Sequence, residues 1–102
     1  MEIKFNSRDP VYVQVVQHFK QQIAIGQLEP GQTIPSRREL ANQFKINPNT
    51  AQRAYKEMEE AGLIRTESNQ PSKITSDQAV IQAVRDELIQ DAVHHFVDSI
   101  QS

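Results

Sequence analysis

The sequence of 102 residues contains no cysteine and only three glycines. The absence of cysteine excludes disulfides, thiol nucleophiles and cysteine-based zinc sites. No Ser/His/Asp set, glycine-rich phosphate loop or clustered carboxylate pair is visible. His94 and His95 are adjacent, so on a helix they project about 100° apart and do not form a metal site. We interpret the three histidines as surface or interface residues, and we expect no catalytic residues, no metal and no cofactor.

Long apolar runs are also missing, and none of those present could cross a bilayer. The first residues lack the basic-then-apolar pattern of a secretory signal, which predicts a cytoplasmic location and no membrane contact. A chain of this length supports one hydrophobic core rather than two independent ones.

The chain has no overall excess of positive charge, since its net charge is −2. Its charges are, however, unevenly distributed along the sequence. Residues 1–76 hold ten Lys/Arg and eight Asp/Glu, whereas residues 77–102 hold one Arg and five Asp/Glu. We expect the acidic final segment to face away from any phosphate backbone. The alternative is that so small an asymmetry is incidental.

What the sequence does contain is a pair of helix starts between Ser36 and Leu63. Ser36 and Glu39 have the spacing of a capping box, in which each side chain bonds a free backbone N–H of the first turn. Asn47 and Pro48 supply an N-cap followed by a residue whose fixed φ suits the first helical position. The space between these starts holds one short helix and a tight corner. This pattern predicts a helix-turn-helix, and double-stranded DNA as its partner.

The flanking elements complete a winged form of that motif. Asp9-Pro10 opens an earlier helix that ends at Gly26. After Gly62, two strand-like pieces at 63–66 and 73–75 enclose a turn. We therefore predict a mainly α fold with a small β-hairpin, namely a winged helix-turn-helix DNA-binding domain over 1–75. A C-terminal helical dimerisation segment, capped by Ser76, is predicted over 76–102.

The predicted groove-reading helix runs from Pro48 to Ala61 and carries polar residues opposite its apolar face. Arg can donate two hydrogen bonds to guanine, and Asn or Gln can pair with adenine. We assign Asn49, Gln52 and Arg53 to bases, Lys56 to a phosphate, and Thr50 to the flank of this face. All five residues could instead hold phosphates, and the same mixture would also suit an ordinary solvated helix face.

Two adjacent arginines, Arg37 and Arg38, fall in the first turn of the preceding helix, where the helix dipole disfavours cations. Phosphate binding would offset that cost. The alternative is an ion pair with Glu39 or another acid. In the hairpin, Asn69 and Lys73 are candidates for a minor groove or its flanking phosphates.

The final segment repeats apolar residues every three or four positions, which predicts one long apolar helix face. A second copy of the chain is the expected cover for that face, making the protein a homodimer. The alternative is a helix folded back along the first three. The residues assigned to the dimer interface are Ile81, Val84, Leu88, Ala92, Phe96 and Ile100.

Several motifs occur in order and with characteristic spacing between residues 5 and 66. They are Pro10-x-Tyr12-x-Gln14, Pro30-Gly31-x-x-Ile34-Pro35-Ser36-x-Arg38-Glu39-Leu40-Ala41, and Asn47-Pro48-Asn49-Thr50-x-x-Arg53-Ala54-Tyr55-x-x-Met58-Glu59-x-x-Gly62-Leu63-Ile64. On these motifs the chain resembles the GntR family of bacterial transcription regulators, and within it the short YtrA-like group.

This resemblance implies a winged helix that dimerises through its C-terminal helices and binds a palindromic operator. It also places Arg38, Asn49, Thr50, Gln52 and Arg53 at DNA-contacting positions. The chain departs from the family at the wing, where the usual Gly-x-Gly tip is replaced by a glycine-free stretch from Glu67 to Ile74. The remaining tail has room for one long helix or two short ones.

The sequence therefore predicts a homodimeric, sequence-specific transcriptional repressor. An alternative is a winged-helix protein-interaction module that does not bind DNA. A small-molecule effector of unknown identity, held between subunits, stays open as a further partner.

Overall fold

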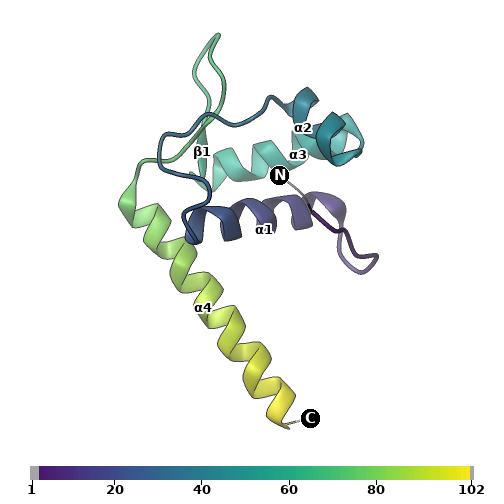
Figure 1. Cartoon of the computed structure of the whole chain (residues 1–102), viewed down its shortest axis with the longest axis vertical. Helices are drawn as coiled ribbons and strands as arrows, with labels where there is room; N and C mark the ends of the chain where they lie inside the picture. The colour runs from purple at the N-terminus through teal and green to yellow at the C-terminus, as the bar shows by residue number, and fades with distance from the viewer. Residues whose placement is uncertain (1–2, 102) are drawn as a thin grey trace.

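A computed structural model describes residues 3–101 of the chain. The first two residues of the predicted segment 1–75 and the last residue of the predicted segment 76–102 lie outside these described residues. The elements, in order, are α1 (Val11–Ala24), α2 (Arg37–Phe44), α3 (Pro48–Glu60), β1 (Ile64–Arg65), β2 (Lys73–Ile74) and α4 (Gln78–Gln101). Helices α1–α3 form one body with the β-hairpin at one side, and α4 runs away from it in the other direction (Figure 1). The predicted winged helix-turn-helix fold is confirmed.

Both predicted helix starts are present in the helix-turn-helix. The Ser36 hydroxyl accepts the Glu39 backbone N–H at 3.1 Å, and the Glu39 carboxylate accepts the Ser36 N–H at 3.3 Å. The Asn47 side chain accepts the Asn49 N–H at 2.8 Å. Lys45 takes a left-handed conformation with φ 55° between the helices. The turn is therefore tight enough to hold α2 against α3.

The core lies where α1 crosses α3. Val15, Phe19 and Ile23 of α1 are at most 2% exposed and form its buried face, while Tyr12 at its start is only half-buried. The Phe19 ring packs edge-to-face against Tyr55 with centroids 6.3 Å apart. The Tyr55 hydroxyl donates to the carbonyl of Pro35, which ties the core to the residue preceding the α2 cap.

The residues before α1 fold back over the helical body. Phe5 packs edge-to-face on Phe44 with ring centroids 6.2 Å apart, and the Gln14 amide donates to the Asn6 carbonyl at 3.1 Å. His18 lies against the same Phe44 ring, with centroids 6.0 Å apart. Burial lowers the pKa of His18 below its ordinary value. His18 is therefore half-buried rather than fully exposed, because the folded-back segment and Phe44 cover part of its ring.

The wing pairs Ile64 with Ile74 and Arg65 with Lys73 in antiparallel register. An isolated bridge from Thr33 to Lys73 adds a third segment to this sheet. It is held by backbone bonds such as Ile34 N–H to the Ser72 carbonyl, at 2.9 Å. The sequence did not reveal this segment, because it lies between two proline-containing turns and has no alternating pattern of its own.

Helix α4 is a single continuous helix of 24 residues. It begins one step later than predicted, because the Asp77 carboxylate, rather than Ser76, accepts a first-turn N–H, that of Ala79, at 2.9 Å. Its first turns are fastened to α1 by the Lys20–Glu87 ion pair at 3.0 Å and by the bond from Arg85 Nε to the Ala24 carbonyl at 3.1 Å. Within residues 3–101 no helix has the length and apolarity needed to span a membrane.

The apolar residues of α4 divide between two faces. Ile81 and Val84 are 3% and 4% exposed and belong to the core of their own chain, and Leu88 packs partly against it. The assignment of Ile81 and Val84 to a dimer interface is therefore wrong, because the first turns of α4 pack on α1 of the same chain. Phe96, Ile100 and Ala92 remain exposed.

The large exposed apolar residues of α4 form one stripe. At about 100° per residue they fall within roughly 100° of arc on the second half of the helix. Phe96 is 66% exposed and Ile100 is 68% exposed. This apolar stripe comprises Ile89, Val93, Phe96, Val97 and Ile100.

Candidate nucleic-acid interface

The outward face of α3 carries the polar residues that the sequence predicted there. Asn49, Gln52, Arg53 and Lys56 are exposed and Thr50 is half-buried, while Ala51, Ala54, Tyr55 and Met58 are buried on the opposite side. One shallow hollow lies along this face and another lies between its start and α1, and Asn49 and Arg53 line both. The helix therefore presents hydrogen-bonding side chains to solvent, where a ligand can reach them.

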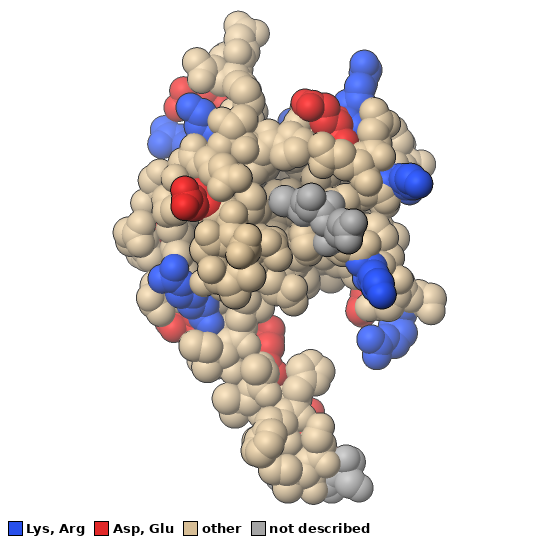
Figure 2. Space-filling view, viewed as in Figure 1, with Lys and Arg blue, Asp and Glu red and all other residues tan. Residues whose placement is uncertain are grey.

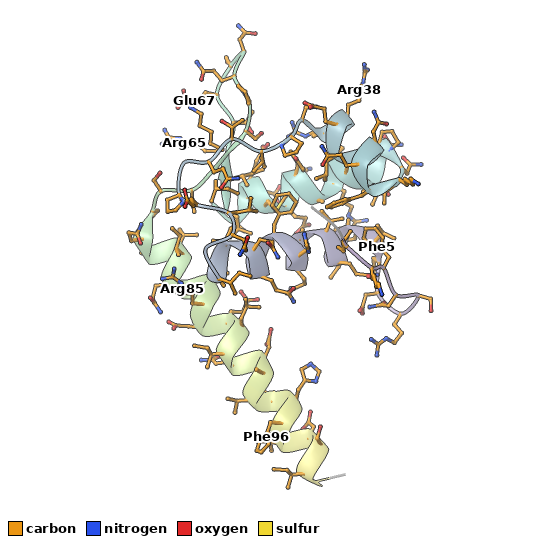
Figure 3. All side chains as sticks on the ribbon, viewed as in Figure 1. Phe5, Arg38, Arg65, Glu67, Arg85 and Phe96 are labelled. Atoms are coloured by element: carbon orange, nitrogen blue, oxygen red, sulfur yellow. The ribbon has the colours of Figure 1, made fainter. Side chains whose placement is uncertain are left out.

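Arg38 lies on the same side of the molecule as the wing. In Figure 3 it points outward from the start of α2 at the end of the molecule that also carries the wing with Arg65 and Glu67, while Phe96 lies at the far end of α4. Arg38 is exposed, and its side chain makes no hydrogen bond or ion pair with the rest of residues 3–101. The position predicted to bind a phosphate is therefore accessible.

Arg37 does not share that role. Its Nη2 lies 2.6 Å from Glu59 Oε1 on α3, and its Cζ lies 5.3 Å from the centroid of the Tyr55 ring. The phosphate contact predicted for Arg37 is thus replaced by the alternative, an ion pair with an acid. That acid is not the neighbouring Glu39, whose carboxylate belongs to the capping box of α2.

Glu59 continues this contact into the wing. The Thr66 hydroxyl donates to Glu59 Oε1 at 3.0 Å and lies 2.6 Å from the Ser72 hydroxyl. Ser72 is buried at 6% exposure, so this end of the chain of contacts is shielded from water. Arg37, Glu59, Thr66 and Ser72 thereby connect α2, α3 and the base of the wing. No sequence signal marks this polar chain, because its members are far apart in the sequence and follow no helical or strand period.

Replacement of Glu59 with glutamine tests this polar chain. We expect Glu59→Gln to lower the free energy of unfolding by about 1 kcal/mol, a small value because the Arg37–Glu59 pair is only partly buried. Urea denaturation measures this change, and hydrogen exchange should show faster opening in the wing than in α1. The exposed neighbour Glu60 gives the matched control, since Glu60→Gln should change stability by less than about 0.5 kcal/mol. Equal stabilities of the two variants would contradict the assignment.

The wing offers exposed side chains rather than a bare backbone. Asn69 at its tip takes a left-handed conformation with φ 60°, which asparagine tolerates better than most residues. Lys73 is exposed, and Arg65 is 80% exposed with only a 3.9 Å contact to Glu67. Asn69 therefore supplies the turn geometry that a glycine-free tip needs, and it leaves its amide at the surface.

Charge is distributed along the long axis of the molecule. After Arg85 the sequence holds no Lys or Arg. Figure 2 accordingly shows Lys and Arg over the helical body and its wing side, and none on the far half of α4. The acidic segment thus extends away from the wing and from Arg38.

Arg53 makes one contact that the sequence did not indicate. Its Nη2 donates to the hydroxyl of Tyr12 on α1 at 3.1 Å, and its Cζ lies 3.9 Å from the centroid of the Tyr12 ring. The two residues lie 41 positions apart, so no helical or strand period links them. The one sequence signal for Tyr12 is its position near the start of α1, whose first turn is half-buried.

Comparison with known proteins gives a consistent result. The family model described as "Bacterial regulatory proteins, gntR family" matches residues 11–74. An uncharacterized HTH-type transcriptional regulator of Bacillus subtilis, YhcF, is 34% identical over 101 residues, covering 99% of this chain and 84% of its own. The HTH-type transcriptional repressor YtrA of the same organism is 42% identical over 66 residues, covering 65% of this chain and 51% of its own.

Solved structures show the same similarity. A GntR family transcriptional regulator from Listeria monocytogenes superposes with a TM-score of 0.88 at 31% identity, covering 95% of this chain and 85% of its own. The structure of AraR(DBD) in complex with operator ORX1 superposes with a TM-score of 0.66 at 25% identity, covering 74% of this chain and 96% of its own. The first of these similarities includes most of α4, since it extends over nearly the whole chain.

Proposed function

Because this chain belongs to the GntR family of bacterial regulatory proteins, we propose that it is a sequence-specific DNA-binding transcription regulator that represses its target genes. The relatives that it matches are transcriptional regulators, and the family is not an enzymatic one. Repression is the function in the printed name of YtrA, one of those relatives. The single observation that carries the proposal is the exposed polar face of α3. An exposed Arg38 and the wing lie together at the end of the molecule away from the far half of α4.

We propose distinct roles for the residues on this side. Asn49 and Gln52 at the start of α3 would contact base edges in the major groove, where the first residues of a recognition helix reach deepest. Lys56 and Arg38 would contact phosphates, which fix the position of the protein on the duplex. Asn69 and Lys73 would extend the interface to the neighbouring minor groove or its phosphates. The operator complex of AraR(DBD), which has a similar fold, supports this arrangement.

We further propose that the protein acts as a homodimer in the cytoplasm, with residues 1–75 binding DNA and the far half of 76–102 pairing two chains. The support is the apolar stripe of α4, which no other residue of the described chain covers. A two-fold pair carries two copies of α3, so its operator would be a palindrome. A small-molecule effector held between the subunits is a further proposed partner.

Salt dependence of DNA binding tests the proposed function. Wild-type protein should bind its own promoter fragment tightly at about 50 mM salt and lose affinity steeply by about 200 mM, because phosphate contacts release counterions. Fluorescence anisotropy measures both affinities. If no binding is detected at low salt, the repressor is excluded, and the alternative of a protein-interaction module takes its place.

The variants for this experiment are Arg38→Ala and, as a control for a change of one unit in net charge, Asp98→Asn. The first removes a cation from the proposed DNA side and should reduce the salt slope by about 1, with similar losses on all sequences. The second changes an exposed side chain on the far half of α4, away from both the DNA side and the apolar stripe, and should leave the slope unchanged.

A further inference from the structure

We propose that Tyr12 of α1 and Arg53 of α3 together bind one phosphate of the DNA backbone, with Tyr12 holding the guanidinium in place. The inference rests on the proposed DNA-binding function and goes beyond it, because it adds a residue of α1 to the interface. It also changes the role of Arg53, which was predicted from the sequence to contact a base. Tyr12 is thus both a phosphate ligand and a positioning residue for Arg53.

The geometry of the pair carries the first step. The guanidinium carbon of Arg53 lies 3.9 Å from the centroid of the Tyr12 ring, which is within stacking distance. Its Nη2 also donates to the Tyr12 hydroxyl at 3.1 Å. Two contacts to the same side chain restrict a long, otherwise mobile arginine to one orientation before DNA arrives. That orientation directs the guanidinium from α3 towards α1.

The hydrogen-bond donors that Tyr12 and Arg53 leave unused are suited to an anion. The Tyr12 hydroxyl accepts from Arg53, and its own O–H has no acceptor among residues 3–101. Arg53 keeps further N–H groups, all of them donors. The hollow in which the pair lies is also lined by Asn49, Thr50 and the first residues of α1, and no acidic side chain lines it. A single phosphate oxygen, or two of them, would find donors there and no repelling charge.

The position of the pair favours a phosphate over a base. To read guanine, an arginine presents two N–H groups edge-on to O6 and N7 at the floor of the major groove. The stacked guanidinium instead lies in the hollow between α1 and α3, on the flank of the recognition helix. A helix seated in the major groove has the sugar-phosphate backbone along its flanks. The DNA strand would thus pass over Tyr12 and Arg53 while Asn49 and Gln52 face the bases.

The experiment uses the full chain, its own promoter fragment, and a shuffled fragment of the same composition. Tyr12→Phe keeps the ring and removes only the hydroxyl, so folding should persist, which thermal unfolding by circular dichroism checks. We expect Tyr12→Phe to weaken binding about 10-fold on both fragments, since it removes a hydrogen bond to a charged group. In an Arg53→Ala background, Tyr12→Phe should have little further effect, because the two residues act on the same phosphate.

A base contact gives a different result from a phosphate contact. Asn49→Ala serves as the comparison and should lose affinity on the promoter fragment alone. If Arg53→Ala behaves like Asn49→Ala, or if Tyr12→Phe leaves both affinities unchanged while wild-type protein binds, the Tyr12–Arg53 phosphate site is wrong and the proposed function stands. If wild-type protein binds neither fragment, the proposed function itself fails, and the phosphate site with it.

Discussion

Phe96→Asp is expected to convert the proposed dimer into a monomer and to lower affinity for a two-site operator by about 100-fold or more. The first effect follows from the 66% exposure of Phe96 in the single chain and its place in the apolar stripe of α4. A carboxylate buried there in a dimer would lose its hydration without gaining a partner. The second effect follows because two linked α3 helices bind with an avidity about 10²–10⁴ times greater than one.

Sedimentation and anisotropy measure these two effects on the same samples. His95→Asp is the matched control, since His95 is exposed, adjacent in sequence, and projects about 100° away from Phe96. We expect His95→Asp to remain dimeric and to bind DNA as the wild type does. A dimer that survives Phe96→Asp would show that the stripe is not the contact between subunits.

The second large effect is expected at Tyr55, which is 0% exposed. Tyr55→Ala should lower the free energy of unfolding by about 3–5 kcal/mol, because it removes the ring packed against Phe19 and leaves a cavity. For a domain whose total stability is about 5–15 kcal/mol, this loss would remove roughly a quarter or more of that stability. Tyr55→Phe keeps the ring and loses only the bond to the Pro35 carbonyl, so its cost should be about 1–3 kcal/mol. Urea denaturation separates the two values, and equal losses would contradict the importance of ring packing.

The same residue predicts how stability changes with pH. Burial raises the pKa of Tyr55 above its ordinary value of 10.0, an effect opposed in part by the nearby Arg37 guanidinium. Above about pH 10 the unfolded chain releases this proton while the native chain keeps it, so stability is fully present below that pH and falls above it. Tyr55→Phe has no such proton, and its stability should fall less between about pH 10 and pH 11.5. Parallel losses in the two proteins would exclude Tyr55 as the cause.

Much of the fold was predictable because it depends on short-range chemistry. Ser36 and Glu39 are three residues apart, and the capping box they form needs nothing else from the chain. Asn47 followed by Pro48 fixes the start of α3 in the same way. The apolar positions of α3 repeat with the helical period, so the polar face that carries Asn49 and Gln52 followed directly.

The sequence could not predict the contacts between side chains of different elements. Arg37 meets Glu59 across α2 and α3, and Tyr12 meets Arg53 across α1 and α3, with no periodicity linking either pair. Nor could the apolar pattern of α4 separate its two faces. Ile81 and Phe96 belong to one continuous pattern, but only the packing of the first turns on α1 decides which of them is covered. Periodicity identifies what must be buried, and it does not identify the partner that buries it.

The fastening of α4 to α1 has a consequence for the DNA rather than for the protein. Lys20 is bound to Glu87, and Arg85 is bound to the end of α1. The two α3 helices of the proposed dimer would therefore be held at a fixed distance and a fixed relative orientation. B-DNA rotates by about 34° per base pair, so each base pair inserted between two half-sites turns one of them around the duplex axis. About five extra base pairs would place the second half-site on the opposite side of the duplex, beyond the reach of a rigid arm. Such an operator would therefore tolerate substitutions between its half-sites but not insertions or deletions there, even at base pairs that no side chain contacts.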